Sequence, residues 1–183
     1  MSPALSIVDR IAALCAALDR AGLPWALGGA LALAYATEEP RGTRDIDINV
    51  FVPSTQAASV FAALPPGVRH SAADAAAALN ADQVRLWWDD TPVDIFFAAS
   101  PFHAEVGARC RSVPFAGRTV RVLSAEDLAV FKALFDRSRD WVDIEAMVES
   151  GTIDIEVAAT RLTRLLGDDP RVGRLLALGT MGR

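Results

Sequence analysis

The segment Asp45–Val50 reads DIDINV, and this alternation of acidic and β-branched residues constrains the fold more than any other feature. Successive side chains of a β-strand point to opposite faces, so the two acids share one face and the two isoleucines share the other. The isoleucines need a core to cover them, and the acids then line the open face. We therefore expect a half-buried strand over residues 45–52, within a larger sheet.

A third acid, Asp94, lies in the β-branched and aromatic run Val93–Phe97. An unpaired charge in an apolar strand is costly, so Asp94 needs a partner. Carboxylates on rigid strands suit Mg²⁺, which usually shares its ligands with substrate phosphates. Asp45, Asp47 and Asp94 together predict a site for two Mg²⁺ ions, one on a triphosphate and one on an acceptor hydroxyl. Asp94 is then the expected general base.

The pair Gly28-Gly29 follows an expected short strand, 25–27, and leads directly into an expected helix, 30–36. A strand that turns through glycines into a helix exposes backbone N–H groups at the start of that helix, where anions bind. Glycine also lets a phosphate approach closely and permits positive φ. This turn is the candidate phosphate-binding element.

The rest of the chain predicts an α+β fold, with a mixed sheet flanked by helices and a helical C-terminal part. We expect residues 1–123 to form the core domain and 124–183 a helical subdomain packed on it. Ser54 is the expected N-cap of a helix that ends at Leu64. The residues 89–92 are expected to form the turn between strands 83–88 and 93–98. Further strands are expected over 68–70, 111–115 and 118–123, and further helices over 5–21, 72–79, 102–109, 124–135, 141–149, 154–166 and 171–178.

Composition narrows the class of protein. The chain has 183 residues, of which 52% are hydrophobic, and its net charge of −5 argues against non-specific coating of nucleic acid. Cys15 and Cys110 are far apart and lack metal-site spacing, and Cys15 reads as a small core residue. We expect no secretory signal, and the longest apolar run, 25–36, is too short to cross a bilayer. We expect a cytoplasmic protein with no membrane partner.

Several of these residues form a recognisable pattern. Three short motifs resemble the active-site signature of the DNA polymerase β-type nucleotidyltransferase superfamily. They are Gly28-Gly29, the sequence RDID at 44–47 and the sequence VDI at 93–95. The segments 123–132 and 137–143 are similar to the C-terminal helical signature of AbiEii-type toxin nucleotidyltransferases and related uncharacterised proteins. The resemblance covers residues 24–150.

The resemblance implies roles for individual residues. It implies that Gly28 and Gly29 contact the β- and γ-phosphates of an NTP such as ATP, and that Lys132 contacts the triphosphate. It also implies that the three acids hold Mg²⁺. Many members of the superfamily have Ser where this chain has Gly29, so one hydroxyl contact to phosphate is lost.

Two basic residues have alternative interpretations. Lys132 is the only lysine in a chain whose other basic residues are arginine. It could point to solvent from its helix, but we prefer a phosphate ligand. Arg44 either faces away from the acids or lies at the mouth of the strand, where it would steady Asp45 or the nucleotide.

Aromatic and acidic residues outside the signature have simpler expected roles. Trp87 and Trp88 should face opposite ways; one belongs in the core, and the other packs across strands or stacks on a base. Asp140 and Asp143 are expected to pair with Arg137 or Arg139.

The expected function is metal-dependent transfer of a nucleoside monophosphate from an NTP to an acceptor hydroxyl. The resemblance to toxins favours a tRNA end as the acceptor and raises a cognate antitoxin as a further partner. The acidic net charge favours the alternative of a polycationic small molecule such as an aminoglycoside. A catalytically inactive nucleotide-binding module is the third alternative.

Overall fold

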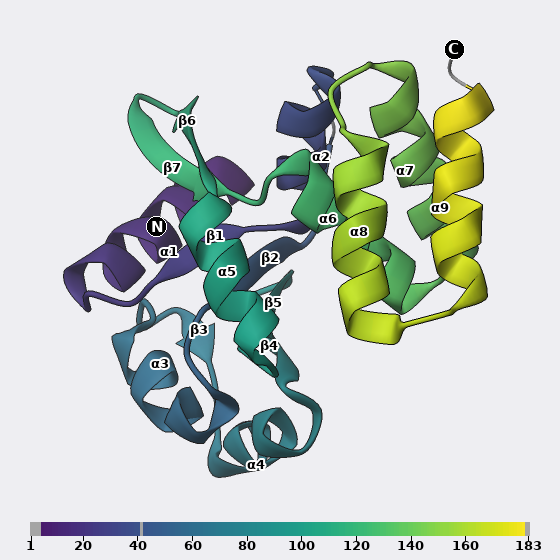
Figure 1. The fold of residues 1–183 in the computed structure, drawn as a ribbon. Coiled ribbons are helices and arrows are strands. Elements are labelled where there is room, and N and C mark those ends of the chain that lie inside the picture. Colours follow the sequence, from purple (N-terminus) through teal and green to yellow (C-terminus); the bar gives the residue numbers. More distant parts are fainter. Residues whose placement is uncertain (1–4, 41, 182–183) are drawn as a thin grey trace. The chain divides into compact units, whose positions relative to one another are not determined.

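The computed structural model describes residues 5–40 and 42–181, and its contacts divide the chain into two compact units (Figure 1). The first unit comprises Met1–Gly28 and Gly42–Val122, and the second comprises Gly29–Arg41 and Leu123–Arg183. Residues 29–41 thus group with the C-terminal helices. The α+β class with a mixed sheet and a helical C-terminal part is confirmed. The division into domains 1–123 and 124–183 stays a prediction.

The first unit contains a seven-stranded mixed sheet with the strand order β3-β4-β5-β2-β1-β7-β6. The β2–β5 and β1–β7 pairs are parallel, and the other neighbouring pairs are antiparallel. The strands are β1 (Trp25–Leu27), β2 (Ile46–Val50), β3 (Val68–Arg69), β4 (Gln83–Trp88), β5 (Thr91–Phe96), β6 (Arg111–Phe115) and β7 (Arg118–Val122).

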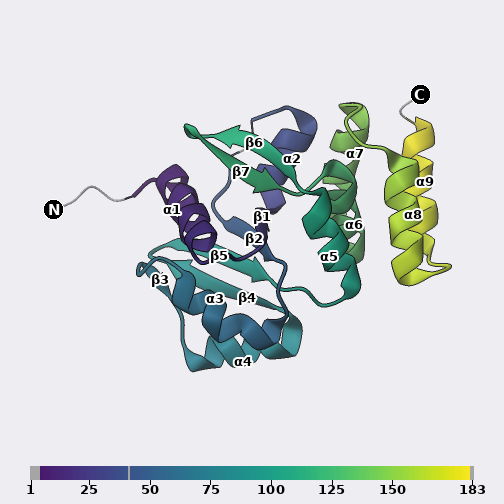
Figure 2. The same ribbon diagram turned by 60° about the vertical axis from the view of Figure 1, so that its left-hand side comes forward.

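Helices cover part of this sheet. They are α1 (Ile7–Arg20), α3 (Ala57–Ala63), α4 (Ala72–Ala81) and α5 (Pro101–Arg109). The helix α1 begins with a capping box between Ser6 and Asp9, and its buried Leu14 and Leu18 lie four residues apart. Cys15 is buried as expected, and this burial raises the pKa of its thiol to about 12. Figure 2 shows α3 and α4 side by side next to β4.

One face of the central strands is apolar and covered. Ile46 and Ile48 on β2 are buried, and so are their register partners Val93 and Ile95 on β5. The alternation read from the sequence is therefore confirmed for the isoleucines, and the opposite face is left for polar side chains. Trp88 also belongs to the covered face, where it packs against Gly67.

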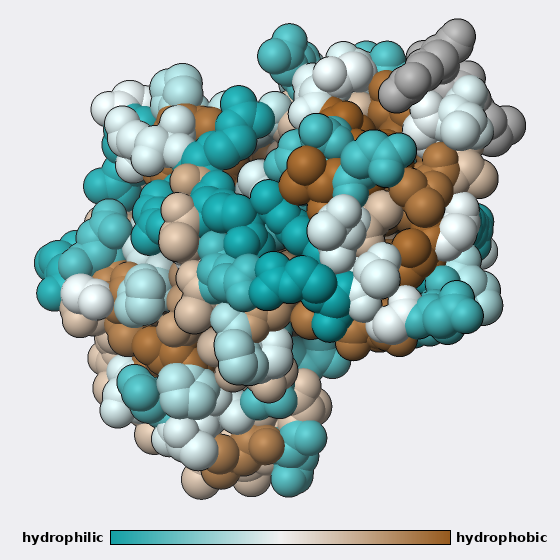
Figure 3. Space-filling view, viewed as in Figure 1, coloured by the Kyte–Doolittle hydropathy of each residue, from teal (hydrophilic) through white to brown (hydrophobic). Residues whose placement is uncertain are grey.

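The second unit is helical. It contains α2 (Gly29–Thr37), α6 (Ala125–Phe135), α7 (Ser138–Glu149), α8 (Ile155–Leu166) and α9 (Pro170–Met181). The helices α8 and α9 lie side by side in both ribbon views, and α8 buries a stripe formed by Ile155, Ala158, Ala159 and Leu162. In Figure 3, the visible surface over these helices carries both hydrophobic and hydrophilic residues.

The expected N-cap at Ser54 is wrong. Ser54 instead begins a short 3₁₀ turn, Ser54–Gln56, whose N-cap is Pro53. The hydroxyl of Ser54 donates a hydrogen bond to Oδ1 of Asp82 at 2.6 Å. The helix α3 starts only at Ala57, and its N-cap is Gln56. Ser54 therefore lies in the turn that precedes α3 and not at the N-cap of that helix.

The expected four-residue turn at 89–92 is also wrong. Strand β5 already starts at Thr91, so the turn contains only Asp89 and Asp90, and Asp89 has a φ of +52°. Arg10 on α1 donates hydrogen bonds to Asp89 at 2.9 Å, to Asp90 at 3.0 Å and to the hydroxyl of Thr91. These bonds anchor the short turn and hence the register of the hairpin.

Among the residues that the structure describes, no helix is both long enough and apolar enough to cross a bilayer.

The helix α7 starts at Ser138, earlier than the expected start at Trp141. The carboxylate of Asp140 accepts a hydrogen bond from the N–H of Arg137 and so stabilises this earlier start.

The packing of Trp88 on Gly67 predicts that Gly67→Ala destabilises the protein by about 1–3 kcal/mol. A Cβ atom at Gly67 would lie 2.7 Å from Cε2 of Trp88, whose side chain is only 6% exposed. Gly42→Ala is the matched control, because a Cβ atom there meets nothing within 4 Å. Urea unfolding measures the stability of both variants, and equal stabilities would contradict the close packing of Trp88 on Gly67.

Candidate functional site

Three charged residues form a row across neighbouring strands of the first unit. Asp47 on β2 is the register partner of Asp94 on β5, and Asp94 is in turn the partner of Arg85 on β4. Residues directly opposite one another share a face of the sheet, so the row lies on the side away from Ile46 and Ile48. The structure therefore brings two of the predicted acids together and adds a cation that the sequence analysis did not predict.

Arg85 binds Asp94 through a bidentate pair of hydrogen bonds. Its Nε donates to Oδ1 of Asp94 at 2.7 Å, and its Nη2 donates to Oδ2 at 2.6 Å. This fork geometry is the strong form of an arginine–carboxylate contact. The side chain of Arg85 is 53% exposed, whereas that of Asp94 is 14% exposed. The acid is thus held in the sheet, while its partner reaches it from the solvent side.

Asp45 lies in a bend just before β2 and not within the strand, as the sequence analysis expected. The hydroxyl of Thr43 donates a hydrogen bond to its Oδ1 at 2.8 Å. The hydrogen bonds to Asp94 raise the pKa of Arg85, and the negative charges of Asp94, Asp45 and Asp47 raise it further, against the effect of burial. All three acids therefore act electrostatically on one guanidinium. We call Asp45, Asp47 and Asp94 the acid cluster.

The acid cluster fits a divalent ion in its chemistry. Within residues 5–40 and 42–181, no group of three or more His, Cys, Asp or Glu is arranged to hold a metal ion. Both oxygens of Asp94 accept hydrogen bonds from Arg85. The donors are nevertheless the carboxylate oxygens that Mg²⁺ prefers, and they already stabilise a positive group.

The glycine pair adjoins the strand that carries Asp47. The N–H of Gly28 donates to the carbonyl oxygen of Asp47 at 2.9 Å, so this amide is hydrogen-bonded to β2. The helix α2 starts at Gly29, whose φ of +49° favours glycine. The N–H groups at the start of α2 are then the ones that remain for a phosphate. The predicted phosphate contacts of Gly28 and Gly29 stay predictions.

Arg44 lies next to Asp45 in the same bend and is exposed. Because this bend precedes β2, the alternation of side chains along the strand does not show which way the side chain of Arg44 faces. Its proposed contact with the nucleotide therefore stays a prediction.

Lys132 belongs to the second unit, on α6, and its side chain does not point to solvent. The residue is 9% exposed, and its Nζ lies 2.6 Å from Oδ2 of Asp143 and 3.6 Å from Oδ1 of Asp140. Two carboxylates of α7 in the same unit therefore balance the charge of the buried Lys132 side chain. Its proposed contact with a triphosphate stays a prediction.

Asp140 is 1% exposed and joins two cations. Its Oδ2 accepts a hydrogen bond from Nε of Arg137 at 2.6 Å, which confirms the expected pairing with that arginine. Burial raises the pKa of the Asp140 carboxyl, but the hydrogen bond from Arg137 and the charge of Lys132 outweigh this effect, so the pKa is lowered overall. Asp143 pairs with Lys132, whose Nζ donates to its Oδ2 at 2.6 Å.

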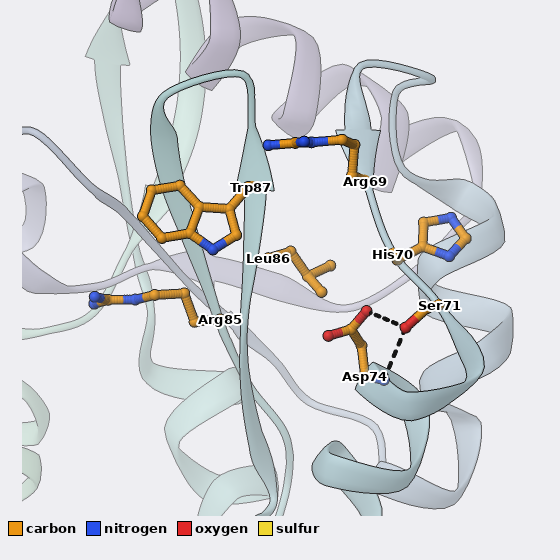
Figure 4. Close-up of a pocket in the computed structure, with 7 residues that line it drawn as sticks. All are labelled: Arg69, His70, Ser71, Asp74, Arg85, Leu86 and Trp87. Carbon is orange, nitrogen blue, oxygen red and sulfur yellow. Dashed lines mark hydrogen bonds between the residues drawn. The ribbon is translucent and has the colours of Figure 1, made fainter.

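The exposed face of β4 continues into a shallow hollow that the sequence analysis did not identify. It has a volume of about 300 Å³, and Figure 4 shows Arg85 and Trp87 on one side of β4 with Leu86 on the other. Trp87 is 42% exposed and is the register partner of Arg69 on β3. The hollow is lined by Arg69, His70, Ser71, Asp74, Arg85, Leu86 and Trp87.

Arg85 was detectable only through the length of the hairpin turn. A two-residue turn at 89–90 places residue 85 opposite residue 94, whereas a four-residue turn at 89–92 places residue 87 there. The sequence shows both arrangements as possible. Asp89-Asp90 is a permissible two-residue turn, and recognising it would have paired Asp94 with an arginine.

Comparisons with known proteins were made on sequence and on structure. The family model described as "Nucleotidyl transferase AbiEii toxin, Type IV TA system" matches residues 12–176. None of the curated proteins matches the chain.

Several solved structures share the fold. The solution structure of the antibiotic-resistance factor ANT(2'')-Ia has a TM-score of 0.61 and 18% identity, and the match covers 95% of each chain. The crystal structure of ANT(2'')-Ia with adenylyl-2''-tobramycin has a TM-score of 0.54 and 19% identity, covering 96% of this chain and 98% of that one. An antigenic nucleotidyltransferase-like protein from Paracoccidioides brasiliensis has a TM-score of 0.55 and 16% identity, covering 92% of each chain.

The contacts of Lys132 predict that Lys132→Met destabilises the protein by about 3–5 kcal/mol, because it leaves two largely buried carboxylates without their shared cation. Lys132→Arg, which keeps the charge, should lose less. Urea unfolding without nucleotide is the measurement. Wild-type stability of Lys132→Met, together with lost NTP binding, would show that the lysine serves the nucleotide and not the helices.

Proposed function

The chain belongs to the AbiEii family of nucleotidyltransferase toxins, and on this premise we propose that its acid cluster catalyses transfer of a nucleoside monophosphate from an NTP to an acceptor hydroxyl. The family match spans the whole acid cluster and makes the chain a nucleotidyltransferase. The observation that carries the proposed site is the register pairing of Asp47 with Asp94 on adjacent parallel strands.

The proposed reaction forms one bond and breaks another. The acceptor oxygen bonds to the α-phosphorus, the bond between the α-phosphorus and the bridging oxygen breaks, and pyrophosphate leaves. The proton of the acceptor hydroxyl passes to Asp94, which lies between Asp47 and Arg85 in the row of charged residues. Such transfer depends mainly on positioning and charge neutralisation.

Asp45, Asp47 and Asp94 are the residues that would hold Mg²⁺, with two ions as the sequence predicts. When bound, Mg²⁺ supplies charge neutralisation for the triphosphate and for the attacking oxygen. The acids themselves fix the direction of approach, because Asp47 and Asp94 project from hydrogen-bonded strands. The hydroxyl of Thr43 holds the carboxylate of Asp45 in the adjoining bend.

Backbone N–H groups at the start of α2 are proposed to bind the phosphates. Anions are favoured there by the helix dipole and by N–H groups without an intrahelical partner. Gly29 contributes the left-handed backbone that the abrupt start of α2 needs. We keep Gly28, Arg44 and Lys132 as proposed nucleotide-binding residues.

An RNA end, such as that of a tRNA, is the acceptor that we propose first. The exposed hairpin face next to Asp94 carries Arg69 and Arg85 on either side of the exposed Trp87. Stacking of bases on an aromatic side chain, with arginines on the phosphates, is the usual way in which proteins hold single-stranded RNA. Because the protein as a whole has a net charge of −5, RNA would have to bind at a local basic surface, and we propose this face as that surface.

A polycationic small molecule is the second candidate. The net charge favours it, and one solved structure with the same fold, that of ANT(2'')-Ia, contains adenylyl-2''-tobramycin. A third possibility, a catalytically inactive nucleotide-binding module, predicts NTP binding without transfer. The toxin–antitoxin description of the family further implies a cognate antitoxin as partner. Use of NTPs suits the cytoplasm, where we place the protein.

The proposed roles of the acids predict that Asp94→Asn lowers the rate of transfer by about 10²–10⁴-fold, because it removes the general base. Asp47→Asn should lower it at least as much. Both variants should keep the wild-type circular dichroism spectrum, since they preserve side-chain volume. Asp168→Asn removes one charge from an exposed position between α8 and α9 and serves as the control. A rate within threefold of wild type for Asp94→Asn would refute the proposal.

The proposed acceptor predicts which molecules become labelled. With labelled NTP, Mg²⁺, total RNA and tobramycin in separate reactions, we expect label in RNA. Trp87→Ala should lower RNA labelling by about tenfold, the equivalent of one lost stacking contact. Arg69→Gln should weaken RNA use and reduce its salt dependence. Labelled tobramycin, with use improved by Arg69→Gln, would instead establish the polycationic acceptor.

A further inference from the structure

We propose that Arg85 is an internal counter-ion that competes with the divalent metal for Asp94, so that the acid cluster accepts the metal only when the guanidinium is displaced. The proposal rests on the proposed function, because it assigns the metal to the same acids. It gives a role to a residue outside the predicted signature.

The geometry sets up a direct competition. Asp94 lies between Asp47 on one neighbouring strand and Arg85 on the other. An ion shared by Asp47 and Asp94 needs at least one oxygen of Asp94, and both oxygens accept hydrogen bonds from Arg85, at 2.6 and 2.7 Å. A metal ion at Asp94 and the full bidentate contact therefore exclude one another.

Arg85 is the partner that can leave. Its side chain is 53% exposed, and both of its hydrogen bonds go to the same carboxylate. A guanidinium at that exposure can rotate into water and regain its hydration there. Asp94 is 14% exposed and is fixed by a strand that is hydrogen-bonded on both sides. Exchange of the cation therefore requires movement of one long side chain and no change in the sheet.

The charge balance explains why a cation is needed before the metal arrives. Asp45, Asp47 and Asp94 place three negative charges around one guanidinium, and all three stabilise its charged form. One positive charge offsets these acids only in part, whereas a divalent ion offsets them more fully. Arg85 thus lowers the repulsion within the acid cluster and still leaves a net attraction for Mg²⁺.

The same displacement prepares the general base. An oxygen of Asp94 that is bonded to Arg85 is not directed at the hydroxyl of an acceptor. Release of the guanidinium exposes that oxygen on the face where Arg85 and Trp87 line the hollow. Arg85 is thus a positioning residue for Asp94, and metal binding and exposure of the base occur together.

The first test measures Mg²⁺ affinity by calorimetry without nucleotide or acceptor. Arg85→Gln removes the fork and the charge, and Arg85→Lys keeps the charge but loses the fork. If Arg85 is bound to Asp94 in nine of ten molecules, its removal tightens Mg²⁺ binding roughly tenfold. We expect this for Arg85→Gln, a smaller tightening for Arg85→Lys, and no change for Arg69→Gln.

The Arg69→Gln control separates competition from general electrostatics. Arg69 lines the same hollow but has Trp87 and not an acid as its register partner. Equal tightening in Arg69→Gln and Arg85→Gln, with wild-type affinity in Arg85→Lys, would show that only net charge matters and would overturn the proposal. Weaker Mg²⁺ binding in Arg85→Gln would overturn it as well.

A second test follows the guanidinium directly. The Nε–H resonance of Arg85 in ¹⁵N-labelled protein should shift and exchange faster with water as Mg²⁺ is added. Asp94→Asn should produce a similar change without metal. The Nε–H of Arg171, which is bonded to Asp169 at 2.8 Å, serves as the internal reference. An Arg85 resonance that stays unchanged at saturating Mg²⁺ would contradict the displacement.

These outcomes are distinguishable from failure of the proposed function. Tighter Mg²⁺ binding in Arg85→Gln, in a protein that transfers no nucleotide to any acceptor tested, would support the competition and refute the transferase site. Normal transfer with the same Mg²⁺ affinity in wild type and in both Arg85 variants would support the transferase site and refute the competition.

Discussion

The pairing of β5 with β2 on one side and with β4 on the other is the constraint on which the candidate site depends. The parallel register puts Asp94 beside Asp47, and the antiparallel register puts Asp94 beside Arg85. A shift of one residue in either ladder would turn Asp94 toward the apolar core, where its charge could not be sustained. The cost of burying that charge therefore helps to specify the pairing.

The sequence was sufficient to predict the face of the sheet that carries the acids. Ile46 and Ile48 bury on one side, so Asp47 must lie on the other, and a strand around Asp94 follows from its β-branched neighbours. Those predictions depend on alternation along a strand, which is a local property. The position of Asp45 in a bend was not predictable in this way, because alternation does not show where a strand begins.

Long-range contacts explain what the sequence analysis missed. Arg85 faces Asp94 because the hairpin turn has two residues, and the turn is held by Arg10, about 80 positions earlier. Ser54 binds the distant Asp82 from a 3₁₀ turn that precedes α3, whose N-cap is Gln56. The scarcity of lysine drew attention to Lys132, but its contacts with α7 follow from helix packing, which no local pattern encodes.

The anchoring of the hairpin by Arg10 also bears on how far the protein can be shortened. A fragment that began after α1 would retain every acid of the cluster, together with Arg85. It would lack the side chain of Arg10, which binds the carboxylates of both Asp89 and Asp90. The minimal piece able to keep this chemistry in register therefore includes an N-terminal helix that contributes no atom to the acid cluster.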